Sequence, residues 1–71
     1  MKGMVEKEFI KKAASYIFEQ RECTIEEALS FVYNSETYSL MDSGSIDSEK
    51  YGVQELLRIF KEEVSGGRVQ L

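Results

Sequence analysis

The sequence contains no histidine and no proline, and Cys23 is the only cysteine among its 71 residues. Without histidine, zinc sites that combine cysteine with histidine are excluded, as are Ser–His and Cys–His catalytic pairs. Because Cys23 has no second cysteine to pair with, no disulfide can form within the chain. We therefore expect no catalytic residues, no metal ligands and no cofactor, and a protein that is not an enzyme.

Positive charge is missing from the middle of the chain. No lysine or arginine lies between Glu22 and Glu49, and the acidic residues within these bounds are Glu22, Glu26, Glu27, Glu36, Asp42, Asp47 and Glu49. This distribution indicates either a solvated acidic face or a negative surface that meets a basic partner. It disfavours nucleic-acid binding through this stretch, because contacts from lysine and arginine to phosphate dominate that affinity.

Long apolar runs are also missing, since none approaches the ~20 residues that a bilayer span requires. Residues 1–5 lack the charged and apolar regions of a secretory signal. A single cysteine is typical of proteins in a reducing compartment. These observations predict a soluble, cytoplasmic protein that does not enter a membrane.

The length corresponds to one helical domain, residues 1–71, with residues 1–4 and 65–71 as flexible ends. A core this small rarely stabilises a fold by more than ~3–5 kcal/mol unless a disulfide, a metal or self-association adds to it. With neither a disulfide nor a histidine-containing zinc site available, self-association or a well-packed helical core remains.

Two amphipathic helices are predicted in the first half of the chain. Residues 5–20 place apolar side chains at four-residue intervals, at Val5, Phe9, Ala13 and Ile17. The second helix begins after Thr24, which fits a capping box with Glu27, and we expect it to end near Asn34, a residue that tolerates a left-handed turn. The apolar residues of each helix span roughly 200°, against the ~100° that a small domain covers. Either the domain wraps these helices tightly or a partner covers the excess.

The second half predicts two further helices. Residues 35–42 are compatible with a short helix capped by Ser35, followed by a loop at residues 43–45. Either Asp47 or Ser48 caps a last helix over about residues 49–64, whose first turn Gly52 weakens and which Gly66-Gly67 ends. The predicted fold is all-α, a small bundle of three main helices plus one short helix.

Residues 24–41 also have the outline of a helix-turn-helix with a break at Asn34-Ser35. The second of these helices carries hydroxyl groups but no cation. An alternative function is therefore a nucleic-acid-associated small regulator with a degenerate helix-turn-helix, which would use the lysines of the first helix, Lys2, Lys7, Lys11 and Lys12.

Three runs follow one another as a series in the middle of the chain: Thr24-Ile25-Glu26-Glu27-Ala28-Leu29, Ser35-Glu36-Thr37-Tyr38-Ser39-Leu40-Met41-Asp42 and Tyr51-Gly52-Val53-Gln54-Glu55-Leu56-Leu57. The series resembles that of short uncharacterised bacterial helical proteins. Some comparable small proteins resemble neighbours of toxin–antitoxin-type genes, and the resemblance implies a partner-binding role.

We therefore expect a protein–protein interaction module that uses an acidic surface and exposed aromatic side chains. The candidate partner-binding residues are Glu26, Phe31, Tyr33, Glu36 and Tyr38. The expected partner is a protein, which includes a second copy of the chain in a homodimer, and neither nucleic acid nor a membrane is expected.

Overall fold

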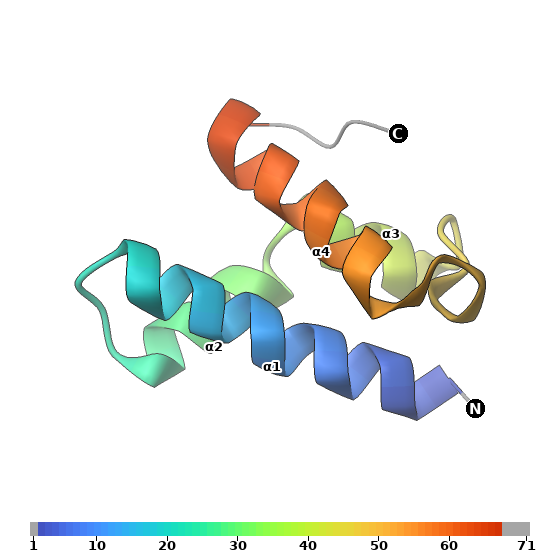
Figure 1. The fold of residues 1–71 in the computed structure, drawn as a ribbon, viewed down its shortest axis with the longest axis horizontal. Helices are drawn as coiled ribbons and strands as arrows, with labels where there is room; N and C mark the ends of the chain where they lie inside the picture. The colour runs from blue at the N-terminus through green and yellow to red at the C-terminus, as the bar shows by residue number, and fades with distance from the viewer. Residues whose placement is uncertain (1, 68–71) are drawn as a thin grey trace.

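The computed structural model describes residues 2–67, and these residues form four helices and no strand (Figure 1). The helices are α1 (Lys2–Gln20), α2 (Ile25–Tyr33), α3 (Glu36–Ser43) and α4 (Ser48–Gly66). The predicted all-α bundle is confirmed, although α2, with nine residues, is only slightly longer than α3, with eight. Residues 2–4 and 65–66, which we expected to be flexible, lie in α1 and α4; residues 1 and 68–71 lie outside the described residues.

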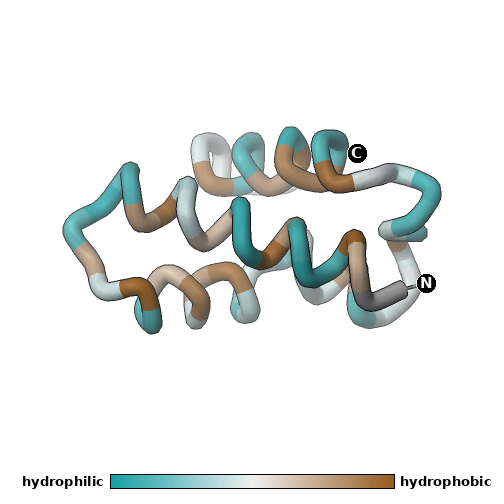
Figure 2. Tube along the Cα trace, turned by 60° about the horizontal axis from the view of Figure 1, so that its bottom comes forward, coloured by the Kyte–Doolittle hydropathy of each residue, from teal (hydrophilic) through white to brown (hydrophobic). Residues whose placement is uncertain are grey.

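Helix α1 lies between α2 and α4 and packs against both, as Figure 2 shows. Helix α3 follows α2 and packs against α4. This arrangement explains part of the wide apolar arc that the sequence places on α1, because a helix with a neighbour on each of two sides buries more of its circumference. No helix in the described part of the chain is long and apolar enough to cross a membrane.

The core is centred on Phe60 of α4. Three aromatic rings meet the ring of Phe60 edge-on, with centroid distances of 5.8 Å from Phe9, 6.5 Å from Tyr16 and 6.4 Å from Phe31. Edge-on aromatic pairs stabilise a fold by about 0.5–1.5 kcal/mol each beyond the area they bury. Phe60 thus joins α1 and α2 to α4 at one point.

The predicted capping box at the start of α2 is present. The Glu27 amide donates to Thr24 Oγ1 over 3.1 Å, and the Thr24 amide donates to Glu27 Oε1 over 2.9 Å. Helix α2 ends at Tyr33, with Asn34 as the capping residue, as predicted, although Asn34, with φ −95°, is not left-handed. The Ser30 carbonyl at the end of α2 accepts both from the backbone amide of Asn34, over 3.0 Å, and from its side chain, over 2.9 Å. An amide side chain can satisfy a terminal carbonyl without a left-handed backbone.

Residues 35–42 do form a short helix, and Ser35 caps it. The Tyr38 amide donates to Ser35 Oγ over 3.2 Å, and Ser35 Oγ donates to the Val32 carbonyl over 2.6 Å. Gly44, with φ +84°, ends α3 in the left-handed conformation that glycine adopts without a steric cost. Ile46 in the following loop is buried, so the connection to α4 is tied to the core.

Helix α4 is interrupted at Gly52. Asp47 is the residue that caps the helix, since its Oδ1 accepts from the amides of Glu49 and Lys50. After one turn the backbone of Gly52 adopts φ +79° and ψ 166°, which is not helical, and the main part of the helix follows. The sequence indicated only a weakened first turn, whereas the structure shows a break between that turn and the rest of the helix. Gly67, with φ +81°, ends α4.

Candidate protein-binding surface

An apolar strip lies along the groove between α1 and α2. We define the α1–α2 strip as Ile10 and Ala14 of α1 and Ile25, Leu29 and Tyr33 of α2, which line a groove of about 420 Å³. The three residues of α2 follow one another at four-residue intervals, so they form a line along one side of the helix. Helical periodicity thus produces a continuous apolar line next to α1.

The two ends of the α2 half of the strip, Ile25 and Tyr33, remain open to solvent. Ile25 and Tyr33 are each 50% exposed and Leu29 is partly buried, while Ala28 and Val32 on the adjacent side of α2 are fully buried. Ala28 and Val32 of α2 belong to the core together with Ala14 of α1, and Ile10 and Leu29 pack against that core. Ile25 and Tyr33 are thus the strip residues whose apolar surface lies largely outside the core. Contiguous exposed apolar surface on a small domain is typical of an interaction site.

Phe18 extends this apolar surface toward the end of α1. It is 49% exposed, and it follows Ala14 by four residues, which places it on the same side of α1 as the strip. A large aromatic side chain in such a position is of the type that carries binding energy at interfaces.

Charges of opposite sign border the α1–α2 strip. Lys7 and Lys11 line the groove from α1. Glu26 precedes Leu29 by three positions and is exposed, so it borders the strip from the solvent side of α2. Within the described part of the chain, neither these two lysines nor Glu26 forms an ion pair or a side-chain hydrogen bond. All three charges are thus available to a molecule that covers the strip.

A second, larger groove lies on the other side of α1, between α1 and α4. Its volume is about 840 Å³, and it is lined by Met4, Lys7, Glu8, Lys11, Lys12, Ser15, Tyr16, Glu19, Leu57 and Lys61. Much of this lining is charged, and some of the charges already have partners within the groove. Lys12 Nζ lies 3.6 Å from Glu8 Oε2, and Lys61 Nζ lies 5.1 Å from the centre of the Tyr16 ring. Lys7 and Lys11 line both grooves, so they form a ridge between them.

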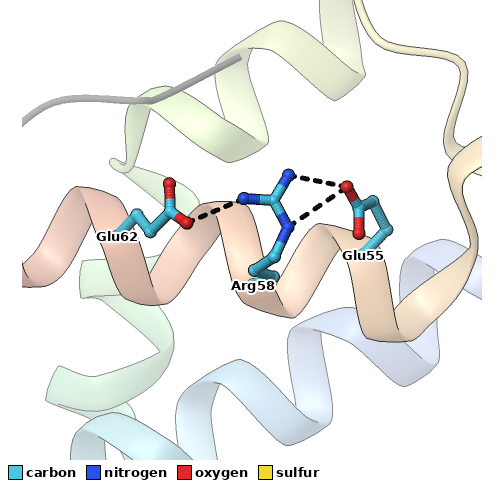
Figure 3. Close-up of polar contacts among 3 residues, drawn as sticks. All are labelled: Glu55, Arg58 and Glu62. Carbon is cyan, nitrogen blue, oxygen red and sulfur yellow. Dashed lines mark hydrogen bonds and ion pairs between the residues drawn. The ribbon is translucent and has the colours of Figure 1, made fainter.

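The arginine of α4 does not contribute free charge to either groove. Figure 3 shows Arg58 between Glu55 and Glu62, with Nη2 2.6 Å from Glu55 Oε2 and Nη1 2.7 Å from Glu62 Oε2. The hydrogen bond to Arg58 lowers the pKa of Glu55, and the bonds from Glu55 and Glu62 raise the pKa of Arg58. The arginine is therefore occupied on the surface of its own helix.

The structure separates the predicted partner-binding residues into three places. Tyr33 lies on the α1–α2 strip and Glu26 borders it. Phe31 is partly buried on Phe60, and the guanidinium of Arg21 lies 4.7 Å above its ring. Glu36 begins α3 and is exposed. Of the five residues, Glu26 and Tyr33 are the ones at the strip itself.

Tyr38 connects α3 to the end of the strip. Its ring meets that of Tyr33 edge-on at a centroid distance of 5.1 Å. The pKa of Tyr38 is raised, first because partial burial disfavours the phenolate and then because Glu6, Asp42 and Tyr33 lie near it. Tyr38 thus packs edge-on against Tyr33, and its hydroxyl stays neutral over a wider pH range than that of a solvated tyrosine.

Sequence reasoning missed one polar side chain that organises this end of the molecule. Glu63 of α4 accepts hydrogen bonds from the amides of Glu36 and Thr37, at 2.8 and 2.9 Å, and from Thr37 Oγ1 at 2.7 Å. A carboxylate at a helix N-terminus satisfies unpaired amides and faces the positive end of the helix dipole. The pair Glu62–Glu63 was visible in the sequence, but the distance along the chain between Glu63 and α3 left no local signal.

The geometry offers an apolar contact surface between α1 and α2. Among the described residues, no group of cysteine, aspartate or glutamate side chains could hold a metal ion. No family model matches the sequence, and no curated protein and no solved structure matches it. The resemblance to short bacterial helical proteins therefore stays a prediction.

Proposed function

We propose that this protein is a protein–protein interaction module and that it binds its partner on the α1–α2 strip. The observation that carries the proposal is the line of Ile25, Leu29 and Tyr33, in which Ile25 and Tyr33 are each 50% exposed although the other side of α2 already contributes to the core. The apolar area of these side chains is removed from water only when another molecule covers it, and this burial favours association.

Charge adds selectivity to the proposed contact. Glu26 and the ridge of Lys7 and Lys11 border the strip without internal partners in the described structure. Such charges at the rim of an interface select partners and accelerate association more than they add affinity. Glu36 lies at the start of α3, and its role in the acidic surface stays a separate proposal.

The test is affinity capture from cells that naturally contain the protein, with three tagged forms of the chain. Ile25→Glu places a charge on the strip, and an acidic residue in the first turn of α2 suits the helix dipole. Met4→Glu is the matched control, because Met4 is 76% exposed in the first turns of α1 and lines only the α1–α4 groove. Circular dichroism verifies that both variants keep the helical fold.

We expect the same partner to be retained by the original chain and by Met4→Glu, and to be lost with Ile25→Glu. The partner, once purified, should bind the original chain directly and Ile25→Glu at least ~10-fold more weakly, since hot-spot substitutions cost more than about 1.4 kcal/mol. A partner that binds Ile25→Glu as tightly as the original chain would remove the strip from the proposal. A second copy of the chain is the competing occupant, and the size of the isolated protein separates the two.

Nucleic-acid binding is a second candidate, and one observation favours it. Lys7, Lys11, Lys12 and Lys61 all line the α1–α4 groove. Against it, α3 carries no lysine or arginine, so the second helix of the helix-turn-helix outline has no cation for phosphate. A gel-shift titration with duplex DNA at low salt tests this candidate, and no shift at about micromolar protein counts against it.

A further inference from the structure

From the ridge of lysines beside the α1–α2 strip, we infer that the partner presents an amphipathic helix with acidic residues along the edge that faces α1. The inference rests on the protein-binding role proposed above and specifies the chemistry of the partner. An apolar groove between two helices accepts the apolar side of a third helix, which is a recurring mode of peptide recognition.

The dimensions of the strip fit a helix of two to three turns. From Ile25 to Tyr33 the strip covers nine residues. Its eight steps correspond to a rise of roughly 12 Å at ~1.5 Å per residue. Anchors at positions i, i+4 and i+7 of a partner helix cover a similar length. The groove, with a volume of about 420 Å³, has room for the side chains of such a helix but not for the helix itself.

The charges determine which edge of the partner helix faces α1. Lys7 and Lys11 are four residues apart, so their ammonium groups are separated by about one helical turn, the same spacing as two carboxylates at i and i+4 on a partner helix. Both lysines are exposed and make no ion pair within the described residues, so they need not break an existing bond to meet those carboxylates. The two lysines lie on the α1 side of the strip, and Glu26 borders the opposite, α2 side. The acidic edge of the partner helix therefore faces α1.

The floor of the groove argues against phosphate as the target of this ridge. Ile10, Ala14, Ile25 and Leu29 form an apolar floor beside two cations. A nucleic-acid site gains its affinity mainly from many phosphate contacts, to which an apolar groove floor contributes little. The combination of two lysines with an apolar line is instead complementary to a helix that is apolar on one face and acidic at its edge.

The experiment uses synthetic helical peptides as probes, labelled for fluorescence polarisation. The acidic probe carries leucine at i, i+4 and i+7, glutamate along one edge and glutamine along the other; the basic probe has lysine in place of glutamate. Each is titrated with the full chain and with the double variant Lys7→Glu plus Lys11→Glu. Lys12→Glu is the matched control, since Lys12 lies on the same helix but lines only the α1–α4 groove.

We expect the original chain and Lys12→Glu to bind the acidic probe about 10-fold more tightly than the basic probe, as two charge pairs at an apolar rim predict. The double variant should reverse this order, a result that loss of stability cannot imitate. Equal affinity for both probes, no binding of either, or an unchanged order in the double variant would overturn the inference. So would self-association of the original chain that Ile25→Glu abolishes, or binding to anionic phospholipid vesicles that Ile25→Glu abolishes, since the strip would then belong to a second copy or to a membrane.

Failure of this inference and failure of the proposed function give different results. If neither probe binds, but a captured partner still depends on Ile25, the strip remains a protein-binding surface with a partner of other chemistry. If the captured partner is indifferent to Ile25→Glu, the proposed function itself is wrong, whatever the probes do.

Discussion

A single carboxylate, that of Glu63, attaches the start of α3 to α4. It accepts from two backbone amides and from the hydroxyl of Thr37, a residue with no exposed surface. Removal of Glu63 takes this acceptor from the partly buried amide and hydroxyl of Thr37 and from the exposed amide of Glu36. A glutamate at an exposed position can usually be replaced without loss of stability. The carboxylate of Glu63, by contrast, is required for the structure because it satisfies these donors.

We expect Glu63→Ala to lower the free energy of unfolding by about 1–2 kcal/mol, the cost of losing a helix cap. Glu63→Gln keeps one acceptor oxygen, so its free energy of unfolding should lie between those of the original chain and Glu63→Ala. The control is Glu62→Ala, which removes an exposed contact to Arg58 and should cost no more than about 0.5 kcal/mol. Urea denaturation followed by circular dichroism measures all three, and equal losses for Glu62→Ala and Glu63→Ala would contradict the capping role.

Tyr38 makes the stability of the fold depend on pH at its alkaline limit. Because its pKa is higher in the folded chain than the usual value near 10, the neutral phenol is favoured by folding. This contribution is complete below the unfolded pKa and is lost as pH rises through the folded pKa. We expect the stability difference between the original chain and Tyr38→Phe to change from about pH 9 upward and to be constant below it. Denaturation of both proteins across this range is the measurement; a pH-independent difference would show that Tyr38 does not titrate in this way.

At the scale of the elements, α4 is two helical segments joined at Gly52. The φ of +79° and ψ of 166° belong to a region that glycine alone enters readily. A Cβ at this position would meet no atom within 4 Å, so the cost of a substitution comes from the backbone and not from a clash.

We expect Gly52→Ala to destabilise the fold by about 1–3 kcal/mol, the cost of a side chain in that backbone region. Gly66→Ala is the control, because Gly66 lies at the helical end of α4 with open space around it. There alanine should be neutral or stabilise by up to about 1 kcal/mol through its helix propensity. Thermal denaturation of both variants compares them, and equal effects would argue against strain at Gly52.

The boundaries of the elements were predictable where their causes are local. Thr24 and Glu27 are three residues apart, so four consecutive residues of the sequence suffice to predict their reciprocal hydrogen bonds. The break at Gly52 was not predictable, because a glycine in a first turn fits a weak helix as well as an interrupted one. The contact of Glu63 with α3 joins residues 26 and 27 positions apart, and no periodicity along either helix indicates it.

At the scale of the whole molecule, the excess apolar surface was predictable but its location was not. Periodicity gives the width of an apolar face on one helix, whereas the position of α1 between α2 and α4 decides which part of that face is covered. On α1, two neighbours cover much of the arc; on α2, Ile25 and Tyr33 stay open. The predicted acidic surface likewise becomes specific only when Glu26 is seen beside the strip and opposite Lys7 and Lys11.

The size of the isolated chain in solution reports whether the strip is already covered. The structure has a radius of gyration of 11.2 Å, and a compact particle of twice the length has about 14 Å. If the strip awaits a different protein, small-angle X-ray scattering at low concentration should give a value near the smaller one, and Ile25→Glu should leave it unchanged. A value near the larger one that falls with Ile25→Glu would identify a homodimer through the strip.

The bond between Glu63 and α3 also sets an order of events during synthesis. Residues 2–43, which contain α1, α2 and α3, leave the ribosome before Glu63 does. Until then the first amides of α3 and the hydroxyl of Thr37 have only water as the substitute for their carboxylate. The rings of Phe9, Tyr16 and Phe31 likewise lack their contact with Phe60 until α4 has emerged. The nascent chain therefore completes its core and the position of α3 together, once α4 is available.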